Sequence, residues 1–117
     1  MKFSVLVAII PEELEKSCTD AAKELGAGGI TILSGRGISN TPKKTLFGLS
    51  FEGGQTVLVM VLEKGLSLEV MKCIQNEVMP DGHNSKGVVF TVPLEHLGGI
   101  DPTQVEQFED YLRDKNS

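Results

Sequence analysis

The chain has 117 residues, enough for one hydrophobic core but not for two independently folding halves. Its apolar content of 40% is ordinary for a globular protein, and no apolar run approaches the roughly 18 residues needed to cross a bilayer. The formal net charge of −5 opposes the binding of nucleic-acid phosphates. We therefore expect one soluble domain over residues 1–117, with no nucleic-acid partner and no membrane insertion.

The N-terminal stretch is short and apolar, but Pro11, Glu12 and Glu13 follow it without a small-residue cleavage site. It therefore resembles a buried first strand more than a signal peptide. Only two cysteines occur, Cys18 and Cys73, which is too few for a disulfide framework and favours a reducing compartment. We predict a cytoplasmic protein.

Acidic residues are missing from two segments of this acidic chain. Residues 25–51 contain no Asp or Glu but have three basic residues, and residues 82–94 contain no acid but have Lys86. Such segments could hold a small anion while the rest of the protein repels polyanions. Chance clustering of eleven basic residues explains the pattern about equally well.

The first half of the chain predicts a strand, a helix and a second strand. Residues 3–10 are almost wholly apolar and rich in β-branched residues, as expected for a strand covered on both faces. Pro11 suits a first helical position, apolar residues recur at helical spacing up to Leu25, and Gly26 ends the helix. Residues 30–33 form the next strand, which ends at Gly35.

A long connection, about residues 36–56, precedes the third strand at 57–62, although residues 45–51 could extend a ribbon. The second helix is expected to begin with Ser67 as its cap and to break at Pro80. A loop over residues 80–87 leads into a fourth strand at 88–92. The last helix, 102–113, is expected to begin after Asp101 as its cap.

The order of these elements is β-α-β-β-α-β followed by a helix. This is the split βαβ arrangement of the α+β, ferredoxin-like fold. Both main helices of that fold cover the same face of the sheet, so a monomer should show alternating polar residues on the other face. The strands at 3–10 and 57–62 do not alternate, and a set of large apolar side chains is left without cover.

Exposure of that second face costs on the order of 1.5–3 kcal/mol for each large apolar side chain, which is comparable in sum to the stability of a small domain. We therefore expect the face to pack against other copies in a closed oligomer. The alternative is that the helix 102–113 folds over the face. It has only three or four apolar positions, too few to cover four strands.

Residues suited to catalysis are scarce. His83 and His96 are the only histidines, and neither has the spacing of a zinc site. Cys18 falls on the inner stripe of its predicted helix and is expected to be a core residue. The chain contains no nucleophile elbow and no Walker lysine motif. We predict no enzyme activity, no metal site and no covalently bound cofactor.

Two loops remain as candidate ligand sites. The first combines backbone N–H groups beside glycines with one guanidinium suited to a phosphate or carboxylate, and consists of Gly35, Arg36 and Gly37. The second lies immediately before the fourth strand and consists of Ser85, Lys86 and Gly87. Glycine and serine are also ordinary turn residues, so each loop alone is weak evidence. The 21-residue connection from Arg36 to Thr56 is long enough to indicate a functional loop.

Three stretches together resemble the P-II nitrogen-regulatory signalling family and the P-II-like proteins, over about residues 2–113. They are the opening strand through Pro11, the Gly-Ile-Thr-Ile strand that runs into Gly35-Arg36-Gly37, and the strand at 87–95. The resemblance implies a homotrimer with adenine nucleotides bound in clefts between protomers. It also implies a long loop that docks on a transporter, enzyme or channel, here residues 37–55 with Ile38, Ser39, Asn40, Lys43 and Lys44.

The chain departs from the family pattern in its basic residues. It has Gly35-Arg36-Gly37-Ile38 where the family has Gly-Phe-Gly-Arg, and Ser85-Lys86-Gly87-Val88 where the family has Gly-Asp-Gly-Lys. Paired arginines after the fourth strand are replaced by Leu97-Gly98-Gly99-Ile100. Each missing cation removes a contact to phosphate of about 1.5–3 kcal/mol, which disfavours tight triphosphate binding.

The sequence therefore predicts a P-II-like signal-transduction regulator that binds a small effector, an adenine nucleotide or another small anion, between protomers. Two alternatives of the same fold stay open. One is an oligomeric interaction scaffold without a ligand, and the other is a metal-tolerance-type trimer or small enzyme. Fold alone does not decide among them, because this fold hosts many activities.

Overall fold

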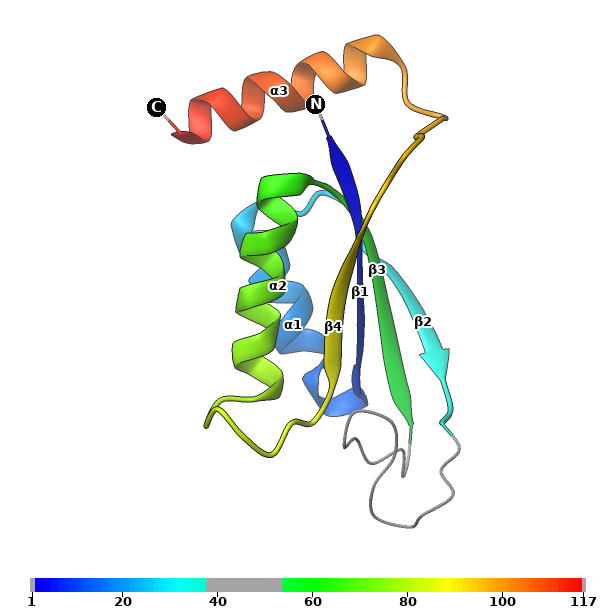
Figure 1. Ribbon diagram of the computed structural model, residues 1–117, viewed down its shortest axis with the longest axis vertical. Coiled ribbons are helices and arrows are strands. Elements are labelled where there is room, and N and C mark those ends of the chain that lie inside the picture. Colours follow the sequence, from blue (N-terminus) through cyan, green and yellow to red (C-terminus); the bar gives the residue numbers. More distant parts are fainter. Residues whose placement is uncertain (1, 38–53, 117) are drawn as a thin grey trace.

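The computed structural model describes residues 2–37 and 54–116. A sheet of four strands has helices on one side and another helix at one end (Figure 1). In chain order the elements are strand β1 (Phe3–Pro11), a short 3-10 helix η1 (Glu12–Leu14), helix α1 (Glu15–Leu25), strand β2 (Thr31–Gly35), strand β3 (Gln55–Glu63), helix α2 (Lys64–Val78), strand β4 (Val88–Pro93) and helix α3 (Pro102–Asn116).

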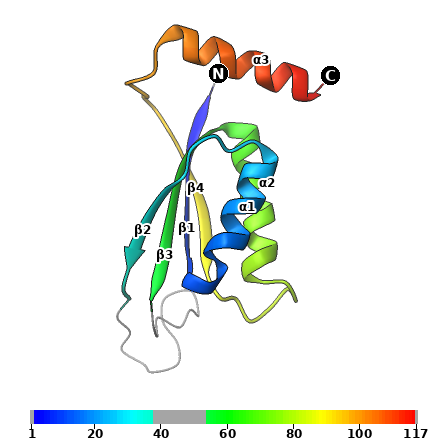
Figure 2. The same cartoon turned by 180° about the vertical axis from the view of Figure 1, so that it is seen from behind.

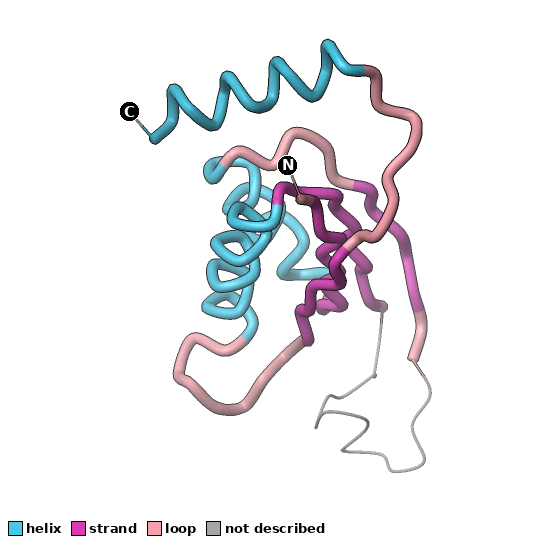
Figure 3. The backbone as a smooth tube through the Cα atoms, turned by 45° about the horizontal axis from the view of Figure 1, so that its top comes forward, coloured by secondary structure: helices cyan, strands magenta, loops and turns pink. Residues whose placement is uncertain are grey.

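The sheet has the strand order β2-β3-β1-β4, and each neighbouring pair is antiparallel. The first and third strands form the centre, and the second and fourth form the two edges. Helices α1 and α2 both lie on one side of the sheet, as Figures 2 and 3 show from two further directions. This arrangement confirms the predicted ferredoxin-like α+β fold.

The core lies between the sheet and these two helices. Burial alternates strictly along β1, from half-buried Phe3 to buried Ser4 and onward, so every second side chain points to the helices. The helices contribute Cys18 and Ala22 from α1 and four residues from α2. The fully enclosed large side chains are Leu6, Ile10, Leu58, Met60, Val70 and Ile74.

The first helix begins later than the sequence predicted. Pro11 is the last residue of β1 and pairs with Gln55, and the 3-10 turn Glu12–Leu14 separates it from α1. Proline tolerates this place because its fixed φ also suits extended backbone at a strand end. The predicted end of the helix is confirmed, because Gly26 adopts a φ of 115° and its N–H reaches the carbonyls of the last turn.

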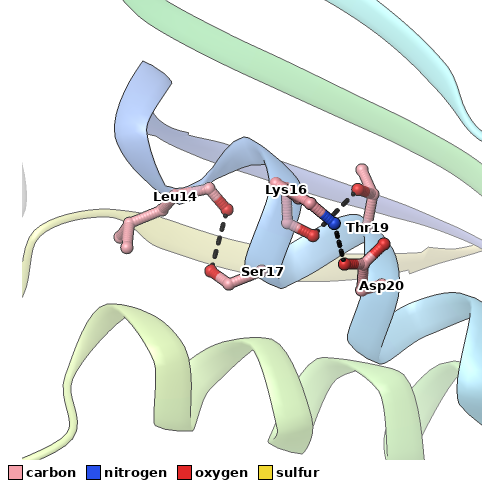
Figure 4. Close-up of polar contacts among 5 residues, drawn as sticks. All are labelled: Leu14, Lys16, Ser17, Thr19 and Asp20. Carbon is pink, nitrogen blue, oxygen red and sulfur yellow. Dashed lines mark hydrogen bonds and ion pairs between the residues drawn. The ribbon is translucent and has the colours of Figure 1, made fainter.

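Hydroxyl and charged side chains bond along the first turns of α1 (Figure 4). The Ser17 hydroxyl donates to the Leu14 carbonyl and the Thr19 hydroxyl donates to the Lys16 carbonyl, each at 3.1 Å. Lys16 and Asp20 form an ion pair of 2.8 Å on the exposed side, and their hydrogen bond lowers the pKa of Asp20. These contacts join residues only three or four positions apart, so they stabilise the start of the helix and leave these side chains with local partners.

The predicted cap of the second helix was wrong. Helix α2 starts at Lys64, and the carboxylate of Glu63 accepts hydrogen bonds from the N–H groups of Gly65 and Leu66, each at 2.9 Å. A carboxylate at this position satisfies two unpaired donors and complements the positive end of the helix dipole. Ser67 is instead buried inside the helix and bonds to the carbonyl of Lys64.

The face of the sheet away from α1 and α2 is largely apolar. The strand register aligns Val5, Val7 and Ile9 of β1 with Val61, Val59 and Val57 of β3. On the other side β4 continues each row with its own apolar residues. The most exposed large members of this open face, from 41% to 51%, are Leu33, Val61, Phe90 and Val92. Burying such residues is worth about 1.5–3 kcal/mol each, so the open face is a strong candidate interface.

Helix α3 does not cover the open face. It lies across the end of the sheet where β1 begins, and its Tyr111 reaches the end of α1. A Cβ placed on Gly26 would lie 2.9 Å from the Tyr111 hydroxyl. The alternative that the last helix folds over the second face is therefore not what the structure shows.

The buried thiol of Cys18 confirms its predicted place in the core. Burial, followed by the nearby Glu77 charge, raises the pKa of Cys18 to about 11. The other free cysteine, Cys73, is half-buried. Because thiol reagents attack the thiolate, the two cysteines should differ in reactivity.

We expect iodoacetamide at pH 8 to modify Cys73 well before Cys18, because a thiol with a pKa of about 11 is almost wholly protonated there. Pulse labelling followed by peptide mass spectrometry measures both rates. The two sites should label alike in denaturant. Equal rates in the folded protein would contradict the burial of Cys18.

Placing a carboxylate at the centre of the open face should prevent self-association. Val7 lies between Val59 and Phe90, so we expect Val7→Glu to shift the protein to monomers in size-exclusion chromatography with light scattering. Gln75→Glu, on the exposed side of α2, is the matched control and should leave the mass unchanged. An unchanged oligomer in the Val7→Glu variant would show that this face is not the interface.

Candidate functional site

The first predicted ligand loop lies at the end of β2. Gly35 is the last residue of the strand and pairs with Gln55, and the Arg36 side chain is exposed just beyond it. A Cβ on Gly35 would touch only a methyl group of Val57, at 3.5 Å, which is an ordinary contact. Packing therefore does not require glycine at this position, and the exposed guanidinium is free to approach an anion.

The second predicted ligand loop is held firmly between α2 and β4. The Lys86 N–H donates to the Val78 carbonyl at 2.9 Å. The Ser85 hydroxyl donates to the Gly87 carbonyl and accepts from the Gly87 N–H. The hydroxyl is thus engaged inside the loop, while the Lys86 side chain is exposed beside it. Of the three predicted residues, Lys86 is the one whose side chain is available to a ligand.

Gly87 has a packing role that the sequence did not reveal. It is buried, and a Cβ there would lie 2.6 Å from the backbone carbonyl oxygen of Ile9. It would also lie 3.1 Å from Ile10 and 3.2 Å from Val78. Glycine permits this close approach of the loop to β1.

The two loops share one end of the sheet but lie at opposite edges. Gly35 pairs with Gln55, Gln55 pairs with Pro11, and Val88 of β4 pairs with the nearby Ile9. Three strand spacings of about 4.8 Å separate the edges, so the loops stand about 14 Å apart within one chain. The backbones of the two loops therefore do not adjoin within one chain.

Two carboxylates also lie at this end of the sheet. The Thr56 hydroxyl donates to Glu15 at 3.0 Å. The Glu12 carboxylate lies against Gly54, because a Cβ placed there would be 2.2 Å from a Glu12 oxygen. These contacts tie the start of the first helical segment to the start of β3. Both contacts join residues more than 40 positions apart in the sequence, so no local pattern indicates them.

The predicted partner-contact residues Ile38, Ser39, Asn40, Lys43 and Lys44 lie outside the described residues. In the part of the chain that is described, no group of three His, Cys, Asp or Glu side chains is placed to hold a metal ion. No helix described here is long and apolar enough to cross a membrane. His83 bonds locally, with its Nδ1–H donating to the Asp81 carbonyl at 2.9 Å.

The opposite end of the sheet carries a groove of about 610 Å³ that was not predicted from the sequence. It is lined by Lys2, Lys64, Phe3 of β1, and the segment after β4. The two lysines meet because Phe3 pairs with Glu63 in the sheet, which places their neighbours side by side. In the sequence, Lys2 comes just before β1 and Lys64 just after β3. Only the strand register shows that these two positions are neighbours.

Solved structures with a similar fold include PII-like proteins, although no protein-family model and no curated protein matches the sequence. A PII-like signaling protein from Thermus thermophilus has a TM-score of 0.61 and 21% identity, over 80% of this chain and 88% of that one. CPII from Thiomonas intermedia, a nitrogen regulatory PII-like protein bound to ADP, AMP and bicarbonate, has a TM-score of 0.56 and 20% identity, over 86% and 98%. Its apo form has a TM-score of 0.58 and 18% identity, over 80% and 90%.

The described chain is thus a ferredoxin-like α+β protein with two cationic loops at one end of its sheet. Its fold is that of the PII-like signalling proteins. This likeness confirms, at the level of the fold, the resemblance predicted from the sequence.

We predict different effects on stability when a glycine is replaced in each of the two candidate loops. Gly87→Ala should destabilise the fold by about 1–3 kcal/mol, because its Cβ meets backbone that cannot move freely. Gly35→Ala should leave stability nearly unchanged, because only ordinary contact is made. Chemical denaturation followed by circular dichroism measures both variants. Equal stability of Gly87→Ala and the parent protein would contradict the close packing of this loop on β1.

Proposed function

We propose that this chain is a P-II-like, non-enzymatic signalling regulator that acts as a homotrimer in the cytoplasm. Each cleft between neighbours binds a small anionic effector, with an adenine nucleotide as the proposed class. Arg36 and Lys86 supply the charged contacts, and Gly35, Gly37, Ser85 and Gly87 shape the two loops. The long connection, including residues 38–44, contacts a target protein such as a transporter or enzyme involved in nitrogen regulation.

The placement of the two cationic loops is the observation that carries this proposal. Within one chain they lie at the same end of the sheet, about 14 Å apart on opposite edges. In a cyclic oligomer with head-to-tail contacts, one edge of each sheet meets the opposite edge of the next. The loop at the end of β2 in one copy then approaches the loop before β4 in its neighbour, and a shared anion site is formed.

The apolar open face supports the same assembly. Three copies that turn these faces toward a common axis bury the valine rows of β1 and β3, and all their cationic loops remain at one end. The free energy of burying the faces exceeds the cost of bringing like charges near each other at the loops, because the loop cations are exposed and screened. Effector anions lower that cost further.

The chemistry of the loops favours a small phosphate-bearing ligand over a polyanion. Each site would offer one guanidinium and one ammonium, together with backbone N–H groups near glycines. Two solved PII-like structures contain ADP and AMP, which supports adenine nucleotides as the first class to test. The paired arginines of the family are absent, so a mono- or diphosphate is expected to bind at least as well as a triphosphate.

Isothermal titration of the purified protein with AMP, ADP, ATP and cyclic AMP tests the proposal. We expect binding of at least one nucleotide, with one site for each chain. Arg36→Ala and Lys86→Ala should each weaken binding by about tenfold to hundredfold, because each removes a charge-assisted contact of about 1.5–3 kcal/mol.

Lys72→Ala is the matched control, because Lys72 is an exposed lysine on α2 away from both loops. It should bind as the parent protein does. Mixing the weakened Arg36→Ala and Lys86→Ala chains should restore parent-like affinity at the one cleft of each mixed trimer where their unaltered loops meet. A complete absence of heat for every nucleotide, in a protein that is still oligomeric, would favour a ligand-free interaction scaffold instead.

A further inference from the structure

Helix α3 projects from the rest of the chain. It stands apart from the other helices and strands in all three views (Figures 1 to 3). Its 15 residues carry Val105, Phe108 and Leu112 at helical spacing in the sequence, so the helix is amphipathic. Such a helix is stabilised mainly by packing against another surface.

The exposed side of α3 is acidic. Glu106 and Glu109 are exposed, and neither forms an ion pair with another described residue. Residues three apart on a helix have side chains about 5–6 Å apart, so these two carboxylates form a pair on one face. The neighbouring Asp110 is already occupied by an ion pair with Arg113.

The groove at the start of β1 has matching chemistry. Lys2 and Lys64 are adjacent, because the Lys64 N–H donates to the Lys2 carbonyl at 2.9 Å. Both side chains are exposed, and in the described part of the chain neither has a carboxylate partner. The apolar residues Leu97 and Ile100 of the groove are 39% and 42% exposed. The one acid in the lining, Glu95, is 3.6 Å from His96.

We propose that the groove formed by Lys2, Lys64, Leu97 and Ile100 receives helix α3 of a second copy of this chain. Glu106 and Glu109 of the incoming helix pair with the two lysines, and its apolar edge covers the exposed apolar residues of the groove. The interface therefore adds a contact at the far end of the sheet from the proposed nucleotide cleft. This inference rests on the proposed self-association.

A second copy fits better than the helix of the same chain. In its own chain α3 is placed by Tyr111, which lies against Gly26 at the end of α1. No described carboxylate of α3 reaches Lys2 or Lys64 from that position. The groove also includes Phe3, which belongs to the open face, so a copy packed on that face lies beside the groove. The Gly98-Gly99 pair lies in the segment between β4 and α3. The φ of 84° at Gly99 gives this segment a backbone bend that other residues rarely adopt.

Zero-length cross-linking of isotopically mixed oligomers tests the pairing. Unlabelled and fully ¹⁵N-labelled chains are unfolded, mixed in equal amounts and refolded together, and a carbodiimide then joins lysine amines to nearby carboxylates. We expect peptides that join Lys2 or Lys64 to Glu106 or Glu109, with mixed-label pairs as frequent as same-label pairs. Same-label pairs alone, or no such peptides from an intact oligomer, would overturn the inference while leaving the proposed self-association in place.

Charge variants give a second, independent measurement. Glu106→Gln with Glu109→Gln should raise the concentration of half-dissociation several-fold in light-scattering dilution series, because exposed ion pairs contribute modestly. Glu13→Gln with Glu24→Gln removes two exposed carboxylates elsewhere and should have no effect. Glu106→Lys with Glu109→Lys should weaken assembly further. Adding Lys2→Glu and Lys64→Glu to that double variant should restore assembly. Failure of that combination to restore assembly would count against the pairing, whereas a protein that is monomeric before any substitution would refute the self-association itself.

Discussion

The apolar open face is the constraint on which the rest of this structure depends. One side of the sheet is sealed by α1 and α2, and the other presents rows of valine, isoleucine and phenylalanine across its strands. At about 25 cal/mol per Å² of apolar surface, exposure of so many side chains would cancel much of the stability of a small domain. The proposed self-association would remove that cost, and it would also decide which loops meet. The proposed binding site is thus a property of the assembly more than of the single chain.

The two candidate loops differ in how firmly the rest of the chain holds them. The loop before β4 is fixed by backbone contact, since Gly87 rests on the Ile9 carbonyl and Lys86 is hydrogen-bonded to the end of α2. The end of β2 belongs to an edge strand with a partner on one side only. A charged side chain held by a rigid loop loses less conformational entropy when it binds an anion. Lys86 is therefore the better fixed of the two cationic positions in one chain, and Arg36 has more freedom until a neighbour lies beside its edge.

The sequence predicted the fold well because its strongest signals are local. Runs of β-branched residues marked β1 and β3, and helical spacing marked α1 and α2, so the order of elements followed. The start of α2 was misplaced, because Ser67 is a common capping residue, whereas the helix is in fact capped by Glu63, the last residue of β3. The packing role of Gly87 and the meeting of Lys2 with Lys64 depend on strand register, which no single stretch of sequence specifies.

Charge placement is consistent with the proposed selection of a small anion by an acidic protein. The net charge of −5 repels an approaching polyanion, but exposed charges are screened beyond about 10 Å at moderate salt. A small ligand in the proposed cleft responds mainly to the groups that touch it, and the two loops proposed to form the cleft carry Arg36 and Lys86 without a carboxylate. One guanidinium and one ammonium balance about two negative charges, which is fewer than a triphosphate carries. The same electrostatics that exclude nucleic acid therefore also favour the shorter nucleotides within the proposed class.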